Sequence, residues 1–413
     1  MDRPGPSDGV ADALEAHVIT VTDGARRFAL VVLDVVCVNV DLATSIAAAV
    51  PADDVWVCAT HTHSGPETGC QPRGTTTPTQ WLSVCTAAAV RAAEAAVRSE
   101  VPGTLSVGVS MVASVASVRS NPSGALAVPV DVVSFHTPDG LGGLLVVVPV
   151  HPTVLPFSST VVSADLTGAV RRALADRAPW VVVATGAAGD ISTRGVRQGS
   201  DPAECSRLGR VVASQLTVPP SVAGCGTPWA ATSETVWSAA ADLMVTPLGD
   251  NSPSTQDPCR CSRLELNQGT LDQNCRCNLP TSNRSPVPSP ADSPRAESTD
   301  QAANRSPVLS RQEETLRQAE RLAVRSTEPM RATVRAARLG GVDLIGLPGE
   351  PFLGLRPESA ILLGYVGGYL GYLPTRAAFA GEPTYETVIS PVAPGEPERL
   401  VDAALTLLQN EAS

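Results

Sequence analysis

Two histidines, His61 and His63, lie one residue apart in the segment ATHTHSGP at 59–66, directly after an apolar run. The chain has only five histidines, so this pair concentrates a rare side chain. The apolar run predicts a buried strand, which the Ser-Gly-Pro segment ends. Because alternate positions of a strand share one face, both imidazoles can approach one metal ion or one substrate oxygen. For this pair alone, two ordinary structural histidines remain the alternative.

Three further apolar runs end in residues with comparable chemistry. One ends at His151, and one ends at Glu350 between glycine and proline. A third leads through the small-residue loop at 186–189 to Ser192. The backbone amides of such a loop can approach a substrate closely, so they are candidate donors to an oxyanion. Solvent exposure is the alternative for Glu350, since most glutamates lie at the surface.

Tyrosine is clustered as strongly as histidine. Three of the four tyrosines fall in GYVGGYLGYLPT at 364–375, and the fourth is Tyr385. Spacings of four and three would put the three on one face of a helix. The glycines between them argue against a helix, so we expect irregular structure here.

Taken in order, HTHSGP, HPT, GAAGDIS, PGEPF and GYLGYLPT resemble the motifs of the neutral/alkaline, non-lysosomal ceramidases. That family consists of zinc-dependent amidohydrolases that cleave an N-acyl bond. The resemblance covers most of the chain outside one insert, and the chain is shorter than long members at both ends. It implies four zinc ligands: His61, His151, Glu350 and Tyr372. It also implies four catalytic residues: His63 beside the metal, Ser192 of the GDxS motif, Tyr385 near the reacting carbonyl, and Arg119 on the substrate side.

The residue chemistry agrees with that implication. Two imidazoles, a carboxylate and a phenolate leave an open position on Zn²⁺ for water or a substrate carbonyl. The expected reaction is cleavage of a ceramide-like N-acyl amide by activated water into a fatty acid and a free amine. Two alternatives stay open: a zinc hydrolase of a different N-acyl or ester substrate, and an inactive metal-binding relative that acts as a binding module. Ser192 is either a nucleophile or a hydrogen-bonding group, because a nucleophilic serine needs a nearby base.

Strands alternating with helices indicate an α/β domain, with a mixed sheet flanked by helices. The helices are expected at 42–50, 81–98, 166–175, 205–216 and 398–409. Asp165 fits the N-cap of the third. We expect a single catalytic domain in two parts, 1–245 and 309–413, separated by a disordered insert at 246–308 that is rich in Pro, Ser, Asn, Gln and Arg.

Cysteines and the remaining histidines carry weaker signals. Two C-x-C pairs in the insert are a candidate second zinc site, although C-x₂-C is the usual spacing: Cys259, Cys261, Cys275 and Cys277. Four cysteines of the first part are expected as reduced, buried thiols: Cys37, Cys58, Cys70 and Cys85. His17 and His136 are expected to be ordinary structural histidines.

Composition limits the partners. The net charge is −11, lysine is absent and no basic patch occurs, so nucleic acid is not an expected partner. No apolar run reaches 18 residues, so we expect no transmembrane segment and at most peripheral contact with lipid surfaces. As written, the N-terminus lacks a signal peptide, which predicts a cytoplasmic protein, or a secreted one if the true start lies upstream.

Overall fold

The computed structural model describes residues 6–66, 68–70, 76–221, 236–248, 311–323 and 328–411. The chain divides into two compact units, one formed by 1–249 with 315–413 and the other by 250–314. Of the second unit only 311–314 are described, as the start of helix α6 (Arg311–Leu322). The predicted insert and its C-x-C cysteines therefore lie almost entirely outside the described residues, and their disorder and metal binding stay predictions.

One sheet is built from the N-terminal strands. Its order is β2-β3-β4, with β2 antiparallel and β4 parallel to β3: β2 (Ala16–Thr22), β3 (Arg27–Leu33) and β4 (Asp54–Ala59). Helices α1 (Val40–Ala49) and α2 (Thr79–Arg98) cover one face. Six of the seven residues of β3 are buried, as expected for an aliphatic run that is covered on both faces.

A five-stranded mixed sheet follows. Its order is β10-β5-β6-β7-β9, with only β7 and β9 parallel: β5 (Thr104–Val118), β6 (Leu126–Thr137), β7 (Gly140–Val148), β9 (Val181–Thr185) and β10 (Ile191–Ser192). Helices α3 (Asp165–Ala173) and α4 (Pro202–Gln215) pack on one face.

The third sheet has the order β11-β12-β13-β15, with α9 (Glu396–Glu411) packed against it: β11 (Val236–Val245), β12 (Met330–Leu339), β13 (Val342–Gly346) and β15 (Ile361–Leu363). Two short parallel pairs complete the strands: β1 (Gly9–Val10) with β8 (Val161–Val162), and β14 (Glu350–Pro351) with β16 (Tyr372–Leu373). The short helices are η1 (Leu353–Leu355), α7 (Arg376–Ala380) and α8 (Tyr385–Ile389).

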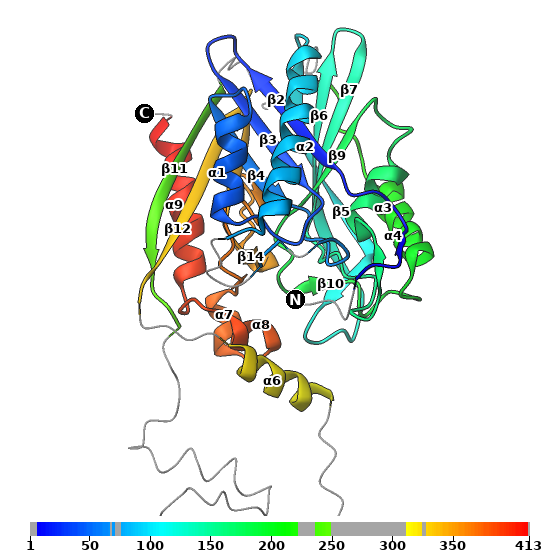
Figure 1. The fold of residues 1–413 in the computed structure, drawn as a ribbon, viewed down its shortest axis with the longest axis vertical. Coiled ribbons are helices and arrows are strands. Elements are labelled where there is room, and N and C mark those ends of the chain that lie inside the picture. The colour runs from blue at the N-terminus through cyan, green and yellow to red at the C-terminus, as the bar shows by residue number, and fades with distance from the viewer. Residues whose placement is uncertain are drawn as a thin grey trace, which may run out of the picture. The chain divides into compact units, whose positions relative to one another are not determined.

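The three larger sheets share one central core. Each has helices on its outer face, as Figure 1 shows for α1 and α2, for α3 and α4, and for α9. Their inner faces meet in one apolar cluster that includes Trp56, Val147, Ala184 and Leu344. The predicted α/β class with mixed sheets flanked by helices is confirmed, although the strands form several sheets rather than one. No helix of the described segments is long and apolar enough to cross a membrane.

The expectation of four reduced thiols is wrong for two of them. Cys37 and Cys70 form a disulfide across 33 positions of sequence, whereas Cys58 and Cys85 are free and buried as expected. Burial raises the pKa of Cys58 to about 12, so that thiol is unreactive. The pairing depends on the segment after β3 lying beside the loop that follows the HTH motif, a long-range contact that cysteine spacing does not encode.

We expect the double variant Cys37→Ala/Cys70→Ala to be less stable than the wild-type protein. Closing a loop of this length restricts the unfolded chain and stabilises the fold by roughly 2–4 kcal/mol. Urea unfolding followed by circular dichroism measures the difference. Cys85→Ala is the matched control, because it removes a buried thiol without breaking a cross-link. Equal stability of the double variant and the wild type would contradict a structural disulfide.

Candidate functional site

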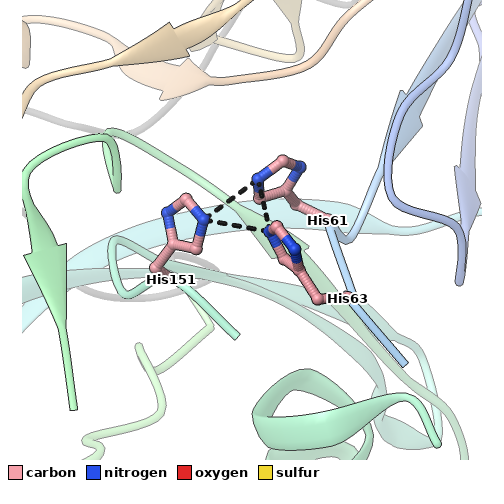
Figure 2. Close-up of side chains that lie close together, drawn as sticks. All are labelled: His61, His63 and His151. Carbon is pink, nitrogen blue, oxygen red and sulfur yellow. Dashed lines mark hydrogen bonds between the residues drawn. The ribbon is translucent and has the colours of Figure 1, made fainter. Parts of the chain in front are cut away.

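The imidazoles of His61, His63 and His151 are turned toward one another around a common point (Figure 2). The Nε2 atom of His61 lies 3.1 Å from that of His151 and 3.1 Å from that of His63, and the third separation is 3.2 Å. Tetrahedral zinc bound at 2.0–2.1 Å holds its nitrogen ligands about 3.3 Å apart. The three nitrogens therefore have the spacing of atoms that share one metal ion.

His61 is held in a conformation that sequence alone does not suggest. It lies beyond the end of β4, and its backbone φ is +65°. This is a left-handed value that residues other than glycine rarely adopt. Its Nδ1 atom lies 2.5 Å from the carbonyl oxygen of Val36, and its ring stacks on Tyr365 with centroids 4.2 Å apart. An Nδ1–H donated to this carbonyl leaves the lone pair on Nε2, where a metal would bind. The histidines thus converge through a strained loop rather than through strand alternation.

His151 comes from the other side of the site, just after β7. Its amide donates to the carbonyl of Ile191 at 2.9 Å, and its backbone bridges to Ser192 on β10. Burial, followed by the positive charge of Arg119, lowers the pKa of His151 well below its usual range. The ring is therefore neutral at physiological pH, which is the form that binds metal.

Glu350 is buried rather than solvent-exposed, with 1% of its surface accessible. Its Oε1 accepts a hydrogen bond from Tyr369 at 2.5 Å, and its Oε2 lies 3.4 Å from Nε2 of His61. Among the described residues no hydrogen-bond donor satisfies Oε2. Burial acts to raise the pKa of Glu350, but His61, Arg119 and Tyr369 outweigh it and the pKa is lowered. An ionised oxygen without a donor, facing imidazole nitrogens, is the arrangement expected of a cation ligand.

Arg119 and Tyr372 extend the site from its other edge. The β14–β16 pairing puts Tyr372 opposite Glu350, and Nη1 of Arg119 donates to the Tyr372 hydroxyl at 2.7 Å. The same Nη1 lies 3.4 Å from Nε2 of His151. The ring of Tyr385 meets that of Tyr372 edge to face, with centroids 6.1 Å apart. The structure therefore brings Arg119 to the histidine cluster, with Tyr372 against Arg119 and Tyr385 against Tyr372.

Three neighbouring residues have site contacts that the sequence analysis missed. Glu386 is buried, and its Oε1 lies 3.3 Å from Nε of Arg119. The ring of Tyr365 stacks on His61, and the Tyr369 hydroxyl donates to Glu350. The clustering of rare tyrosines was a signal for the last two. Glu386 follows Tyr385 directly, but no pattern distinguishes it from a surface glutamate.

The loop before Ser192 differs from its expected role. Two of the amides expected at an oxyanion are already used, since Gly186 donates to Val148 and Gly189 to Pro351. Ser192 is buried, and its Oγ accepts from the amide of Arg194 at 3.4 Å. Within the described chain no imidazole or carboxylate contacts that hydroxyl. The loop is thus held by backbone bonds to β7 and to the Glu350 segment.

Asp165 also differs from its expected role as a helix cap. It is the first residue of α3, with φ at +51°, and Ala164 occupies the N-cap position. Its carboxylate accepts from the amides of Val154 and Leu155 at 3.0 and 2.9 Å. It therefore ties the loop after His151 to the helix, because those amides have no strand partner.

His17 and His136 have ordinary partners. His136 Nε2 lies 3.0 Å from both the Ser134 hydroxyl and the Pro219 carbonyl. His17 is grouped with Glu15 and Asp34 at ligand spacing, but Arg171 contacts the carboxylates of both acids, at 2.8 and 2.9 Å. This arginine supplies the positive charge that a cation would bring, so the group is an ion-pair network.

A cavity of about 160 Å³ adjoins the cluster, and His63 is the one histidine of the three on its wall. The other lining residues are Arg119, Thr153, Leu155, Pro156, Phe157, Arg194 and Arg197. His63 is only partly buried, whereas His61 and His151 are enclosed. Access to the candidate metal centre is therefore from the His63 side.

This fold is that of the neutral ceramidase structures. A structure described as ceramidase complexed with C2 aligns with a TM-score of 0.62 and 17% identity, over 99% of this chain and 76% of that one. Neutral ceramidase from Pseudomonas aeruginosa aligns with a TM-score of 0.62 and 18% identity, over 99% and 75%. No family model and no curated protein matches the sequence. At these identities the likeness establishes the fold.

We expect Glu350→Gln to lower zinc affinity by at least about 100-fold, because a neutral amide replaces the buried anionic oxygen. Zinc retained after dialysis against a chelator, measured by elemental analysis, gives the affinity. Glu358→Gln is the matched control, since Glu358 is exposed. Equal zinc retention in the two variants would exclude Glu350 as a ligand.

Asp190 gives a pH-dependent prediction. Its carboxylate accepts from the amide of Leu353 at 2.7 Å, yet burial raises its pKa from 3.8 to about 6. Because the folded-state pKa is the higher one, this group's contribution to stability is present below about pH 4 and is lost as pH rises through about 6. We expect Asp190→Asn to gain stability relative to wild type across that interval, by at most about 3 kcal/mol. Urea unfolding at pH 4, 5, 6 and 7 measures the difference, and a constant difference would contradict the raised pKa.

Proposed function

We propose that this protein is a zinc-dependent amidohydrolase of ceramidase type, which cleaves an N-acyl amide into a fatty acid and a free amine. The observation that carries the proposal is the meeting of three imidazole Nε2 atoms, 3.1 to 3.2 Å apart, with a buried Glu350 oxygen that has no donor among the described residues. The fold shared with the neutral ceramidase structures supports the same reaction class.

The donor set fits zinc. His61, His151 and Glu350 supply two imidazole nitrogens and a carboxylate, and Tyr372 lies opposite Glu350 as the fourth proposed ligand. Burial raises the pKa of Tyr372 well above its usual range, with Arg119 acting in the opposite direction, so its hydroxyl is protonated without a metal. Bound at such a site, zinc polarises a carbonyl and lowers the pKa of water to about 7.

His63 is proposed as a partner of the reacting groups rather than as a ligand. Its Nε2 is as close to the cluster as the others, but it alone among the three histidines lines the cavity. From there it can accept a proton from the attacking water, or donate a hydrogen bond to the carbonyl oxygen of the substrate. Tyr385 can also donate to that oxygen, since burial raises the pKa of its phenol and keeps it protonated.

Arg119 is proposed to orient the site and stabilise developing negative charge. Its guanidinium is held between the Tyr372 hydroxyl and the Glu386 carboxylate, so it is fixed before substrate binds. We propose water rather than Ser192 as the nucleophile. The Ser192 hydroxyl accepts a hydrogen bond from the backbone amide of Arg194, and no base lies beside it in the described chain.

The Cys37–Cys70 disulfide bears on where the protein works. Disulfides persist in oxidising compartments and are rare in the cytosol. Of the two locations that the sequence leaves open, we therefore propose the secreted one.

The test is hydrolysis of a fluorogenic N-acyl sphingosine by zinc-loaded protein, with zinc content measured on the same samples. We expect the wild type to release fatty acid and amine in equal amounts. His63→Ala is expected to lower kcat by at least about 100-fold while most zinc is retained. Loss of zinc in His63→Ala, equal to that in Glu350→Gln, would make His63 a ligand instead.

Two further outcomes bear on the proposal as a whole. Hydrolysis that survives complete removal of zinc would contradict metal dependence. A zinc-loaded protein that cleaves neither ceramide nor any short acyl amide would contradict the enzymatic function and favour a binding module.

A further inference from the structure

Three arginines line the cavity that adjoins the histidine cluster: Arg119, Arg194 and Arg197. The protein as a whole is acidic, with 41 aspartates and glutamates against 30 basic residues. The cavity wall has the opposite balance, since none of its lining residues is acidic. A wall with this charge selects for a ligand of negative charge.

Only one of these arginines is paired with a carboxylate in the described chain. Arg119 lies 3.3 Å from Glu386, whereas Nη1 of Arg197 donates to the carbonyls of Thr153 and Val154 at 2.8 and 3.1 Å. These carbonyls orient the Arg197 side chain without neutralising it. Glu204, which acts on Arg197 electrostatically, is already paired with Arg207.

Arg194 is the least compensated of the three. Its guanidinium makes no hydrogen bond or ion pair with any described residue, and its only bond is from the backbone amide to Ser192. Arg194 is an exposed residue, and partial desolvation and then the charge of Arg119 lower the pKa of its guanidinium, with Glu386 acting in the opposite direction. A bound anion would offset the repulsion between Arg194 and Arg119, and a guanidinium can hold a carboxylate through two parallel hydrogen bonds.

The cavity is small. Its volume is about 160 Å³, below the roughly 300 Å³ at which pockets for drug-sized ligands begin. One side of it is apolar, formed by Leu155, Pro156 and Phe157, and Phe157 is 61% exposed. The space therefore suits a small charged group, with apolar surface beside it for an attached chain.

We propose that the substrate amide carries a carboxylate within a few atoms of the scissile bond, and that Arg194, supported by Arg197, binds it. This inference rests on the proposed hydrolase function and specifies its substrate class. The C–N bond of the amide breaks, and the oxygen of water bonds to the carbonyl carbon. Both protons of water end on the amine, so that a carboxylate from the acyl half and an ammonium group from the amine half leave. The bound carboxylate belongs either to the amine half, as in an N-acyl amino acid, or to the acyl half.

Two matched substrate pairs test the charge and distinguish these sources. N-octanoylglycine is compared with N-octanoylglycinamide for the amine half, and N-octylsuccinamic acid with its primary amide for the acyl half. Release of glycine, glycinamide or octylamine is measured with zinc-loaded wild-type protein. We expect kcat/KM for the charged member of one pair to exceed that of its neutral partner by at least about tenfold, chiefly through KM.

The variants assign this preference to Arg194. Arg194→Gln is expected to lower the charged-to-neutral ratio of kcat/KM at least about tenfold, and Arg194→Lys to restore part of it. Arg210→Gln on α4 is the matched control, because Arg210 is exposed and does not line the cavity; it should leave the ratio unchanged. Calorimetric binding of octanoate to the zinc-free protein gives a second readout, in which Arg194→Gln should weaken binding by a similar factor.

The outcomes separate this inference from the proposed function. Equal turnover of charged and neutral members, unaffected by Arg194→Gln, would overturn the carboxylate inference and leave the hydrolase intact. Turnover of neither pair by protein that cleaves N-acyl sphingosine would overturn the carboxylate inference and leave the hydrolase intact. Turnover of no amide at all, with octanoate binding that depends on Arg194, would support the anion site and count against the hydrolase. Octanoate binding that is the same in wild type and Arg194→Gln would overturn the assignment to Arg194.

Discussion

The buried carboxylate of Glu350 is the constraint on which the centre depends. An ionised oxygen removed from water costs several kcal/mol unless charge and hydrogen bonds compensate it. Tyr369 satisfies one oxygen, and the other faces the imidazoles without a donor among the described residues. The neighbouring features all serve this compensation: imidazole rings that can share a cation, a fixed arginine nearby, and a backbone that holds His61 in a left-handed conformation. Such strain is tolerated where surrounding packing enforces it.

The architecture explains how residues so far apart in sequence reach one point. Three sheets, each covered by helices on its outer face, meet in a single apolar core. β4 and β7 bring His61 and His151 to the centre, and the β14–β16 pair sets Glu350 opposite Tyr372. The side chains of the candidate site themselves lie beyond the longer strands, in loops and two-residue strands, so a rigid scaffold positions a site built from irregular backbone.

Charge is divided between two zones of the site. The enclosed zone around Glu350 pairs each carboxylate with an arginine, a tyrosine or an imidazole, as Glu386 is paired with Arg119. The open zone beyond His63 contains Arg197, which carbonyl groups orient, and Arg194, and neither forms an ion pair with a carboxylate in the described chain. The first arrangement suits a resident cation and the second suits an incoming anion. A shared fold does not specify both, because substrate preference depends on the residues around the site.

The sequence by itself determined the α/β class, the helices at their approximate bounds and the residue types of the centre. Periodicity and the abrupt ends of apolar runs depend on local chemistry, and so can be interpreted without coordinates. Tertiary structure alone decided the Cys37–Cys70 disulfide, the burial of Glu350 and Glu386, the use of the Gly186 and Gly189 amides by backbone partners, and the cavity with Arg194. Each of these features depends on the packing of segments that are far apart in the sequence. No local sequence pattern indicates which donor, charge or thiol such packing brings together.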